Sequence, residues 1–148
     1  MKIVTFNAGL LSIKLFGKLT VLEPASFVAE RMKALPAHLA STNADVIVIQ
    51  EIYRTEHKRW LACELRGLYT YTAFSQSDPR LRLVPDSLMI LSKYPLTNSR
   101  FVRFRAGLWD ERLLNSKGFL SAEIPDSPLG PMRICNVHTT AGALTHPE

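Results

Sequence analysis

The stretch Asp45–Glu51, DVIVIQE, carries the most information about the fold. Its central residues, Val46–Ile49, are all apolar and β-branched, which favours a strand that is buried on both faces of a sheet. The strand ends on a carboxylate, Glu51. A glutamate at that position is either a solvated strand end or a functional charge held at the rim of the sheet.

The residues before this strand predict another strand and a helix. Ile3–Phe6 has the character of a short buried strand and ends at Asn7. The four-three-four spacing of an apolar helical face is found in Val28, Met32, Leu35 and Leu39. We expect this helix to begin at Glu23-Pro24, where a missing backbone N–H has no cost, and to end near Ser41–Asn43. Pro36 should loosen it, because proline removes one backbone hydrogen bond.

The residues after Glu51 predict one more helix and then mainly strands. The helix covers Arg54–Leu65, with Trp60, Leu61 and Leu65 facing inward. A polar loop is expected at Ser75–Arg80, and strands are expected at Tyr69–Phe74, Leu88–Leu91, Phe101–Phe104, Gly118–Ile124 and Met132–Val137. This order predicts an α/β (α+β) fold, with early parallel pairing through a crossover helix and then hairpins in a mixed sheet.

The composition is that of one globular domain over residues 1–148, with 47% hydrophobic residues. An excess of 18 Lys and Arg over 13 Asp and Glu favours anionic partners, although a protein can be basic without using that charge. We find neither a secretory signal nor an apolar run of membrane-spanning length, and we expect a soluble protein, with the cytoplasm favoured. Cys63 and Cys135 have no metal-ligand or disulfide spacing and are interpreted as small core residues.

Three apolar strands end in polar side chains: at Asn7, at Gln50-Glu51, and at Asn136 and His138. Ligands of α/β sheets bind outside the carboxyl ends of the strands. Because side chains alternate along a strand, Asn136 and His138 share one face. If these strands are neighbours, an amide, a carboxylate and an imidazole converge at one rim, and Glu51 stands where a cation could be held.

A single glutamate beside an amide oxygen suits Mg²⁺, which is usually held by one or two carboxylates together with a substrate phosphate. Zn²⁺ would need a cluster of His or Cys ligands, and the sequence has none. Each residue also has a structural interpretation: Glu51 as a solvated strand end, His138 as a histidine at a sheet edge, and Asn7 as a turn-forming amide. Their recurrence at equivalent strand ends weakens all three of these alternatives.

Five segments appear in the order found in the endonuclease/exonuclease/phosphatase superfamily, and together they cover essentially the whole chain. They are TFNAGL (5–10), DVIVIQEIY (45–53), LMILSKYPL (88–96), KGFLSAEI (117–124) and ICNVHTTAG (134–142). The superfamily includes deoxyribonucleases, abasic-site endonucleases, inositol phosphatases and neutral sphingomyelinases. The resemblance implies a metal-dependent phosphoester hydrolase built on a four-layer α/β/β/α sandwich, a mixed sheet with flanking helices.

The resemblance also implies roles for individual residues. Glu51 would be the Mg²⁺ ligand, with Mn²⁺ as an alternative ion, and Asn7 would support the metal or the phosphate. His138 would hydrogen-bond the phosphate or help the leaving group to depart. Asn136 would support His138 or the site from the same face.

The chain also departs from the pattern of the superfamily. Full members continue past the NVH motif into a half that carries an Asp-x-Asn motif and a terminal Asp-His pair, and this sequence has neither. We therefore expect an N-terminal half of the fold that is catalytically incompetent alone. It would need the missing half, in cis or in trans, or would self-associate through an exposed apolar sheet face. A smaller departure lies at Asp86-Ser87, where relatives commonly place a glycine.

The substrate remains open between a phospholipid and a nucleic acid. Lys117-Gly118 resembles the sphingomyelinase-like branch, and Leu10–Leu22, read as a long loop with two lysines, could touch a membrane surface or fold back into the core. A nucleic-acid backbone could instead follow a set of arginines, Arg80, Arg82, Arg100, Arg103 and Arg105, unless these only form a solvated edge. A third possibility is a non-catalytic half-domain or binding module.

Overall fold

The computed structural model describes residues 1–11, 13–15, 19–22, 26–74, 86–104 and 117–139. Within these ranges the chain forms two helices and nine strands. The helices are α1 (Val28–Ser41) and α2 (Thr55–Leu65). The strands are β1 (Ile3–Asn7), β2 (Ile13–Leu15), β3 (Leu19–Leu22), β4 (Val46–Gln50), β5 (Tyr71–Ala73), β6 (Met89–Ser92), β7 (Thr97–Arg103), β8 (Gly118–Ile124) and β9 (Met132–His138).

The first sheet has the strand order β1-β4-β6-β5. β1 and β4 are parallel, with Asn7 paired to Gln50, and α1 is the crossover between them, as predicted. β6 runs antiparallel to β4, which makes the sheet mixed. β4 is buried on both faces: Ile47 and Ile49 belong to the core under the helices, whereas Val46 and Val48 belong to the core on the other side. The interpretation of DVIVIQE as a doubly covered strand is confirmed.

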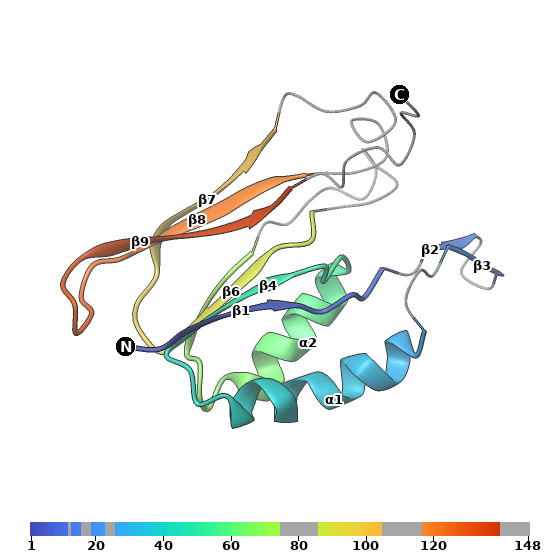
Figure 1. The fold of residues 1–148 in the computed structure, drawn as a ribbon, viewed down its shortest axis with the longest axis horizontal. Helices are drawn as coiled ribbons and strands as arrows, with labels where there is room; N and C mark the ends of the chain where they lie inside the picture. Colours follow the sequence, from blue (N-terminus) through green and yellow to red (C-terminus); the bar gives the residue numbers. More distant parts are fainter. Residues whose placement is uncertain (12, 16–18, 23–25, 75–85, 105–116, 140–148) are drawn as a thin grey trace, which may run out of the picture.

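The second sheet is antiparallel, with the order β7-β8-β9. Its inward side chains, Leu120, Ala122, Ile124 and Ile134, pack on the face of the first sheet that the helices leave open. Figure 1 shows the resulting helix, sheet, sheet layering, with α1 and α2 below and β7–β9 above. The later strands therefore form a sheet of their own rather than an extension of the mixed sheet, and three layers of the expected sandwich are present.

The two helices cover one face of the first sheet, each with the side on which its buried residues recur at helical spacing. In α1 the predicted residues Val28, Met32, Leu35 and Leu39 are all buried. The helix begins at Val28, with Pro36 inside it, while the predicted start at Glu23-Pro24 lies outside the described residues. In α2 the inward face is Lys58, Leu61 and Leu65, and Trp60 is 37% exposed. The prediction for Trp60 was wrong because a neighbour of Leu61 points about 100° away from it.

Two further predictions are corrected. Leu10–Leu22 was expected to be a long loop, but β2 and β3 form an antiparallel pair within it. The segment has no clean alternation that would have revealed the pair. Both cysteines are exposed rather than in the core, Cys63 on α2 and Cys135 on β9 between the buried Ile134 and Asn136. The polar loop predicted at Ser75–Arg80 lies outside the described residues.

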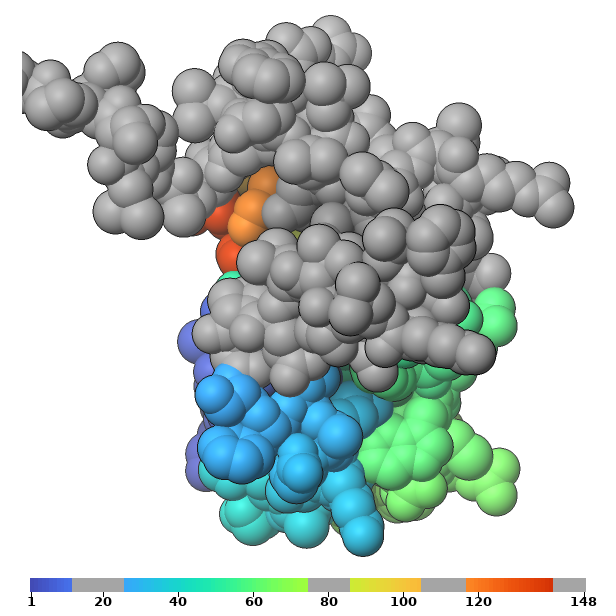
Figure 2. Space-filling view, turned by 90° about the vertical axis from the view of Figure 1, so that its right-hand side faces the viewer, coloured from blue at the N-terminus to red at the C-terminus, as the bar shows by residue number. Residues whose placement is uncertain are grey.

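Strands β1, β4 and β9 bring their carboxyl ends to one end of the molecule. The arrowheads of β1, β4 and β9 all lie on the right-hand side of Figure 1. Figure 2 turns this side toward the viewer and shows the orange and red surface of β8 and β9 above the blue surface of α1. In the described part of the chain, no helix combines the length and the apolar character needed to cross a bilayer.

Candidate active site

The Asn136 side chain links the two sheets by hydrogen bonds next to the candidate site. Its side chain crosses from β9 to the first sheet and donates to the carbonyl oxygens of Ile49 (2.7 Å) and Met89 (3.0 Å). These two residues form the last pair of the β4–β6 ladder, so the amide satisfies carbonyls where that ladder ends. Gln50 Nε2 donates in turn to Asn136 Oδ1 (2.7 Å). Asn136 therefore supports the site by holding the strand end that precedes Glu51.

Glu51 leaves β4 with an unusual backbone conformation. Its φ is 59°, in the left-handed region that a residue with a Cβ rarely adopts. The backbone N–H of Leu10 donates to the Glu51 carbonyl oxygen at 2.9 Å, which holds this bend against the chain that follows β1. Strain of this kind persists only where the surroundings impose it, and it is common at functional sites.

Asn7 and Glu51 meet across the parallel pair β1–β4. Asn7 Nδ2 donates to Glu51 Oε1 at 2.9 Å. The other end of the amide, Oδ1, accepts the N–H of Gly9 at 2.9 Å, so the amide is turned with its NH₂ group toward the carboxylate. Asn7 is thus a turn-forming amide and a partner of Glu51 at the same time.

His138 completes the predicted trio from the second sheet. Its Nε2 lies 3.5 Å from Glu51 Oε1, and its Nδ1 lies 3.2 Å from Ser87 Oγ. Burial lowers the pKa of His138 below its ordinary value, and the nearby Lys117 charge lowers it further, whereas the Glu51 charge opposes both. The half-buried imidazole is therefore neutral at pH 7, with one ring nitrogen able to donate and the other able to accept.

Lys117 reaches the same site from the residue before β8. Its Nζ lies 3.2 Å from His138 Nε2 and 3.4 Å from His138 Nδ1. The next residue, Gly118, pairs with His138 on one side and Arg103 on the other. A Cβ at Gly118 would lie 2.3 Å from the Val102 carbonyl oxygen, so this close packing of β7 on β8 needs a glycine.

Two more residues of the site escaped the sequence analysis. Ser87 and Tyr53 are both buried, and the Ser87 side chain is close enough to Tyr53 to affect its pKa. Burial raises the pKa of Tyr53, and the nearby Glu51 charge raises it further. The position of Tyr53 two residues after Glu51 was a local signal, but nothing local linked Ser87 to His138. Lys117 had been noted only for its resemblance to one branch of a superfamily.

The donor set fits a magnesium ion better than a transition metal. Among the described residues, no three His, Cys, Asp or Glu side chains gather as a metal site. Glu51 is the one carboxylate of the trio, and Asn7 Nδ2 and His138 Nε2 both contact its Oε1. A single carboxylate matches the way Mg²⁺ is held when water and substrate supply its other ligands. The Asn7 amide oxygen is turned toward Gly9, so Asn7 supports the carboxylate rather than the ion itself.

Comparison with known proteins places these observations in a family. The model of the endonuclease/exonuclease/phosphatase family matches residues 4–142. A sphingomyelinase of Dictyostelium discoideum is 34% identical in an alignment 92 residues long, which covers 58% of this chain and 20% of that protein.

Solved structures share the fold at low identity. Sphingomyelinase C from Streptomyces griseocarneus superposes with a TM-score of 0.75 and 18% identity, over 97% of this chain and 50% of that one. A Staphylococcus aureus beta toxin variant with bound magnesium ions gives a TM-score of 0.73 and 19% identity, also over 97% of this chain and 50% of that one. The chain thus spans about half the length of these structures and a fifth of the curated relative.

Proposed function

The chain belongs to the endonuclease/exonuclease/phosphatase family, and from that membership we propose that it is a phosphoester hydrolase that depends on a divalent metal ion. Mg²⁺ is the expected ion, with Mn²⁺ as the alternative, and a phosphodiester lipid is the favoured substrate.

One observation supports this proposal above all others. The side chains of Asn7, Glu51 and His138 come from three strands that end at the same place, and they contact one another through Glu51 Oε1 at 2.9 and 3.5 Å. Phosphoryl transfer requires positioning and charge neutralisation more than covalent chemistry by the protein. A carboxylate, an amide and a neutral imidazole at one strand rim can meet both requirements.

In this proposal Glu51 holds the metal ion and Asn7 steadies the Glu51 carboxylate beside it. The bound ion would neutralise charge on the phosphate oxygens and orient the phosphate. His138 Nε2 would donate a hydrogen bond to a phosphate oxygen, which a neutral imidazole can do. To give a proton to the leaving oxygen, the ring would first take up a second proton and act as the imidazolium. Lys117 would add a positive charge next to that ring. Losing one preorganised donor of this kind costs roughly 10²–10³ in rate.

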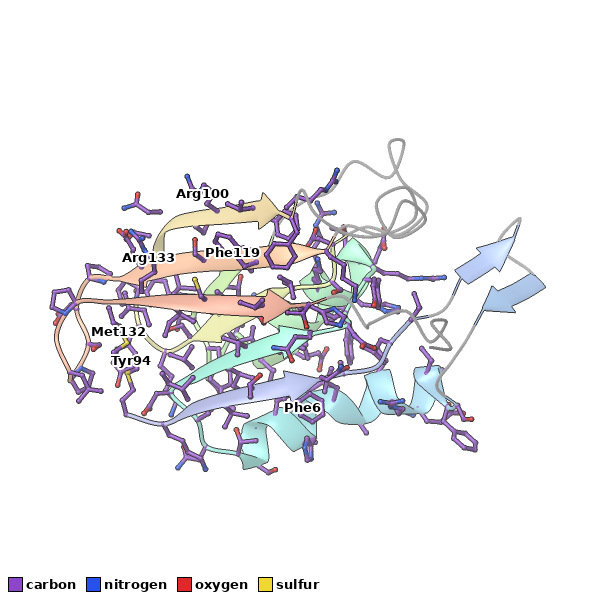
Figure 3. The ribbon with its side chains drawn as sticks, turned by 45° about the horizontal axis from the view of Figure 1, so that its top comes forward. Phe6, Tyr94, Arg100, Phe119, Met132 and Arg133 are labelled. Atoms are coloured by element: carbon purple, nitrogen blue, oxygen red, sulfur yellow. The ribbon has the colours of Figure 1, made fainter. Side chains whose placement is uncertain are left out.

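Lipid is favoured over nucleic acid by the sphingomyelinase relative and by the place of Lys117 in the site. The arginines argue less for a nucleic acid than their number suggests. Arg80, Arg82 and Arg105 lie outside the described residues. Arg100, labelled in Figure 3, lines a polar hollow together with Ser121 and Glu123 of β8. Arg103, three residues further along β7, points to the opposite face because side chains alternate, so these two arginines form no single row along a backbone.

We expect the 148-residue chain to bind metal and phosphate but to turn over poorly by itself. It spans about half of the solved structures that share its fold, and the Asp-x-Asn and Asp-His motifs of the superfamily's other half are absent from its sequence. A second half in cis or in trans, or a second copy of the chain, would supply the partner. Contact of the Leu10–Leu22 segment with a membrane surface belongs to the same proposal.

Metal binding gives the cleanest test. Mn²⁺ affinity of the purified chain is measured by electron paramagnetic resonance for the wild type, for Glu51→Gln and for Glu64→Gln, an exposed glutamate on α2. We expect Glu51→Gln to weaken binding at least tenfold and Glu64→Gln to leave it unchanged. Mn²⁺ affinity that ignores Glu51→Gln would favour a non-catalytic half-domain instead. Because the chain alone is expected to turn over poorly, binding to anionic vesicles and to duplex DNA, measured over a salt series, then separates a lipid enzyme from a nuclease.

A further inference from the structure

A lysine lies in the core behind the candidate site, and its contacts indicate a structural role in that site. Lys58 is 0% exposed, on the face of α2 that otherwise carries leucines. Its Nζ donates to Asp86 Oδ1 (3.0 Å) and to the Asp86 carbonyl oxygen (2.9 Å), and it lies 5.9 Å from the centre of the Phe74 ring. Replacing such a buried ion pair with apolar residues of similar size is often neutral or stabilising, so stability alone gives little reason for a lysine here.

The ion pair fixes the short segment that leads into β6. Asp86 Oδ1 also accepts the N–H of Leu88 at 3.3 Å, which closes a side-chain turn around Ser87. The Ser87 carbonyl oxygen accepts the N–H of Ile52 at 3.1 Å. Lys58 thus holds Asp86, the residue before Ser87, and Asp86 holds Leu88, the residue after it. The backbone of Ile52, next to Glu51, holds Ser87 itself.

The Ser87 side chain connects this fixed segment to His138. Its Oγ lies 3.2 Å from His138 Nδ1. If Ser87 Oγ donates to Nδ1, then Nε2 carries the ring proton and directs it toward Glu51 Oε1, 3.5 Å away.

The opposite direction of donation is disfavoured. It would place the proton on His138 Nδ1 and turn the Nε2 lone pair toward the Glu51 carboxylate. Lys117 does not decide between the two tautomers, because its Nζ is almost equally far from both ring nitrogens, at 3.2 and 3.4 Å. The serine hydroxyl is therefore the contact from which we infer the tautomer.

We propose that Lys58 and Ser87 are positioning residues of the candidate active site, which act through the Asp86 turn to hold His138 in the tautomer that carries its proton on Nε2. This inference rests on the proposed function for its purpose, because the Nε2 proton is the one that would meet the phosphate. Neither residue touches substrate in this account. Lys58 acts through Asp86 and Ser87, and Ser87 acts through the ring of His138.

The test reads the tautomer directly in the whole 148-residue chain. Long-range ¹H–¹⁵N correlation spectra of ¹⁵N-histidine protein at pH 7.5 distinguish the proton on Nε2 from the proton on Nδ1, without metal or substrate. We expect the Nε2–H form of His138 in the wild type. Ser87→Ala removes one neutral hydrogen bond and should lower the ratio of the two tautomers roughly fivefold. Ser87→Thr, which keeps a hydroxyl, should restore it.

Lys58 is tested by Lys58→Met and by the double variant Lys58→Met/Asp86→Asn, which leaves no buried charge behind if the single variant fails to fold. We expect either variant, once folded, to lower the tautomer ratio as Ser87→Ala does. The control is Lys93→Met, which breaks the partly exposed pair with Asp45 (3.3 Å) and should leave His138 unchanged.

Three results would overturn the proposal: a wild type with its proton on Nδ1, an unchanged ratio in Ser87→Ala, or an unchanged ratio in the folded Lys58 variants. A chain that shows the expected tautomers but binds no Mn²⁺ would leave this arrangement standing and remove the proposed function. The two failures are therefore told apart by separate measurements.

Discussion

The side-chain amide of Asn7 donates to Glu51 Oε1 at 2.9 Å, across two parallel strands and a separation of 44 residues. The amide is fixed from its other end by the N–H of Gly9. The hydrogen bond therefore orients the carboxylate that would hold the metal ion, and it gives the site a part whose loss can be measured without any substrate.

Asn7→Ala should weaken Mn²⁺ binding by about tenfold, because partners that orient a metal ligand typically contribute 10- to 100-fold in affinity. The measurement is a titration followed by electron paramagnetic resonance. A matched control is Asn98→Ala, which removes an equivalent amide-to-carboxylate hydrogen bond (2.6 Å, to Glu123) from the second sheet. Equal losses in both variants would show that Asn7 has no particular role at the metal.

The left-handed backbone conformation of Glu51 should lower the free energy of unfolding of the protein. At a φ of 59°, a residue with a Cβ is strained by about 1–2 kcal/mol relative to glycine. Glu51→Gly and Glu51→Ala remove the same functional group and differ only in that Cβ. We expect Glu51→Gly to be the more stable of the two by about 1 kcal/mol in urea unfolding with EDTA present. Equal stabilities would mean that the bend is not strained.

Gly118→Ala should destabilise the protein by roughly 1–3 kcal/mol, because the new Cβ would lie 2.3 Å from the Val102 carbonyl oxygen and force β7 away from β8. It should also displace Lys117, the preceding residue. Gly67→Ala is the control, since no atom lies within 4 Å of its added Cβ. Urea unfolding gives the free energies, and the His138 ring signals report whether Lys117 has moved.

The stability of the fold should fall as the pH falls from neutral. Burial lowers the pKa of His138 in the folded protein below the ordinary value of 6.5, so the unfolded chain binds a proton that the folded protein does not. Stability is then complete above about pH 6.5 and declines as the pH drops toward the folded-state pKa. His138→Gln should flatten this slope in urea unfolding measured from pH 7.5 downward. Lys117→Met should raise the His138 pKa observed by NMR titration, since the Lys117 charge lowers it.

Asn136→Leu should be among the most damaging changes in the core. It leaves the carbonyl oxygens of Ile49 and Met89 buried without their donor, at a cost of roughly 2–4 kcal/mol in unfolding free energy. The neighbouring variant Cys135→Ala, at an exposed position on the same strand, should stay within about 0.5 kcal/mol of the wild type. A mild Asn136→Leu would mean that water replaces the amide.

The sequence predicted those parts of the molecule that have a local pattern. The apolar run of β4 predicted burial on both faces, and the polar residues at the ends of β1, β4 and β9 predicted the meeting of Asn7, Glu51 and His138. Lys117 and Ser87 could not be placed at that meeting point from the sequence. They arrive there only because the second sheet packs over the first, and that packing has no signature within any one element.

The local pattern also gave a wrong prediction in α2, where a polar residue lies on the buried face and an apolar one lies outside it. Trp60 was expected inside α2 because it is large and aromatic, yet the buried face contains Lys58 instead. A buried lysine is acceptable there because Asp86, 28 residues further along the chain, pairs with it. Such a partner is visible only after the chain has folded.

The amide of Asn136 has one more consequence, for motion within the fold. From a strand of the second sheet it donates to two carbonyl oxygens of the first, one of them on Ile49, two residues before the bend at Glu51. Sliding of one layer over the other would pull on these hydrogen bonds before it disturbed anything else at the strand ends. A displacement of β9 would therefore also move the end of β4, which leads directly into Glu51.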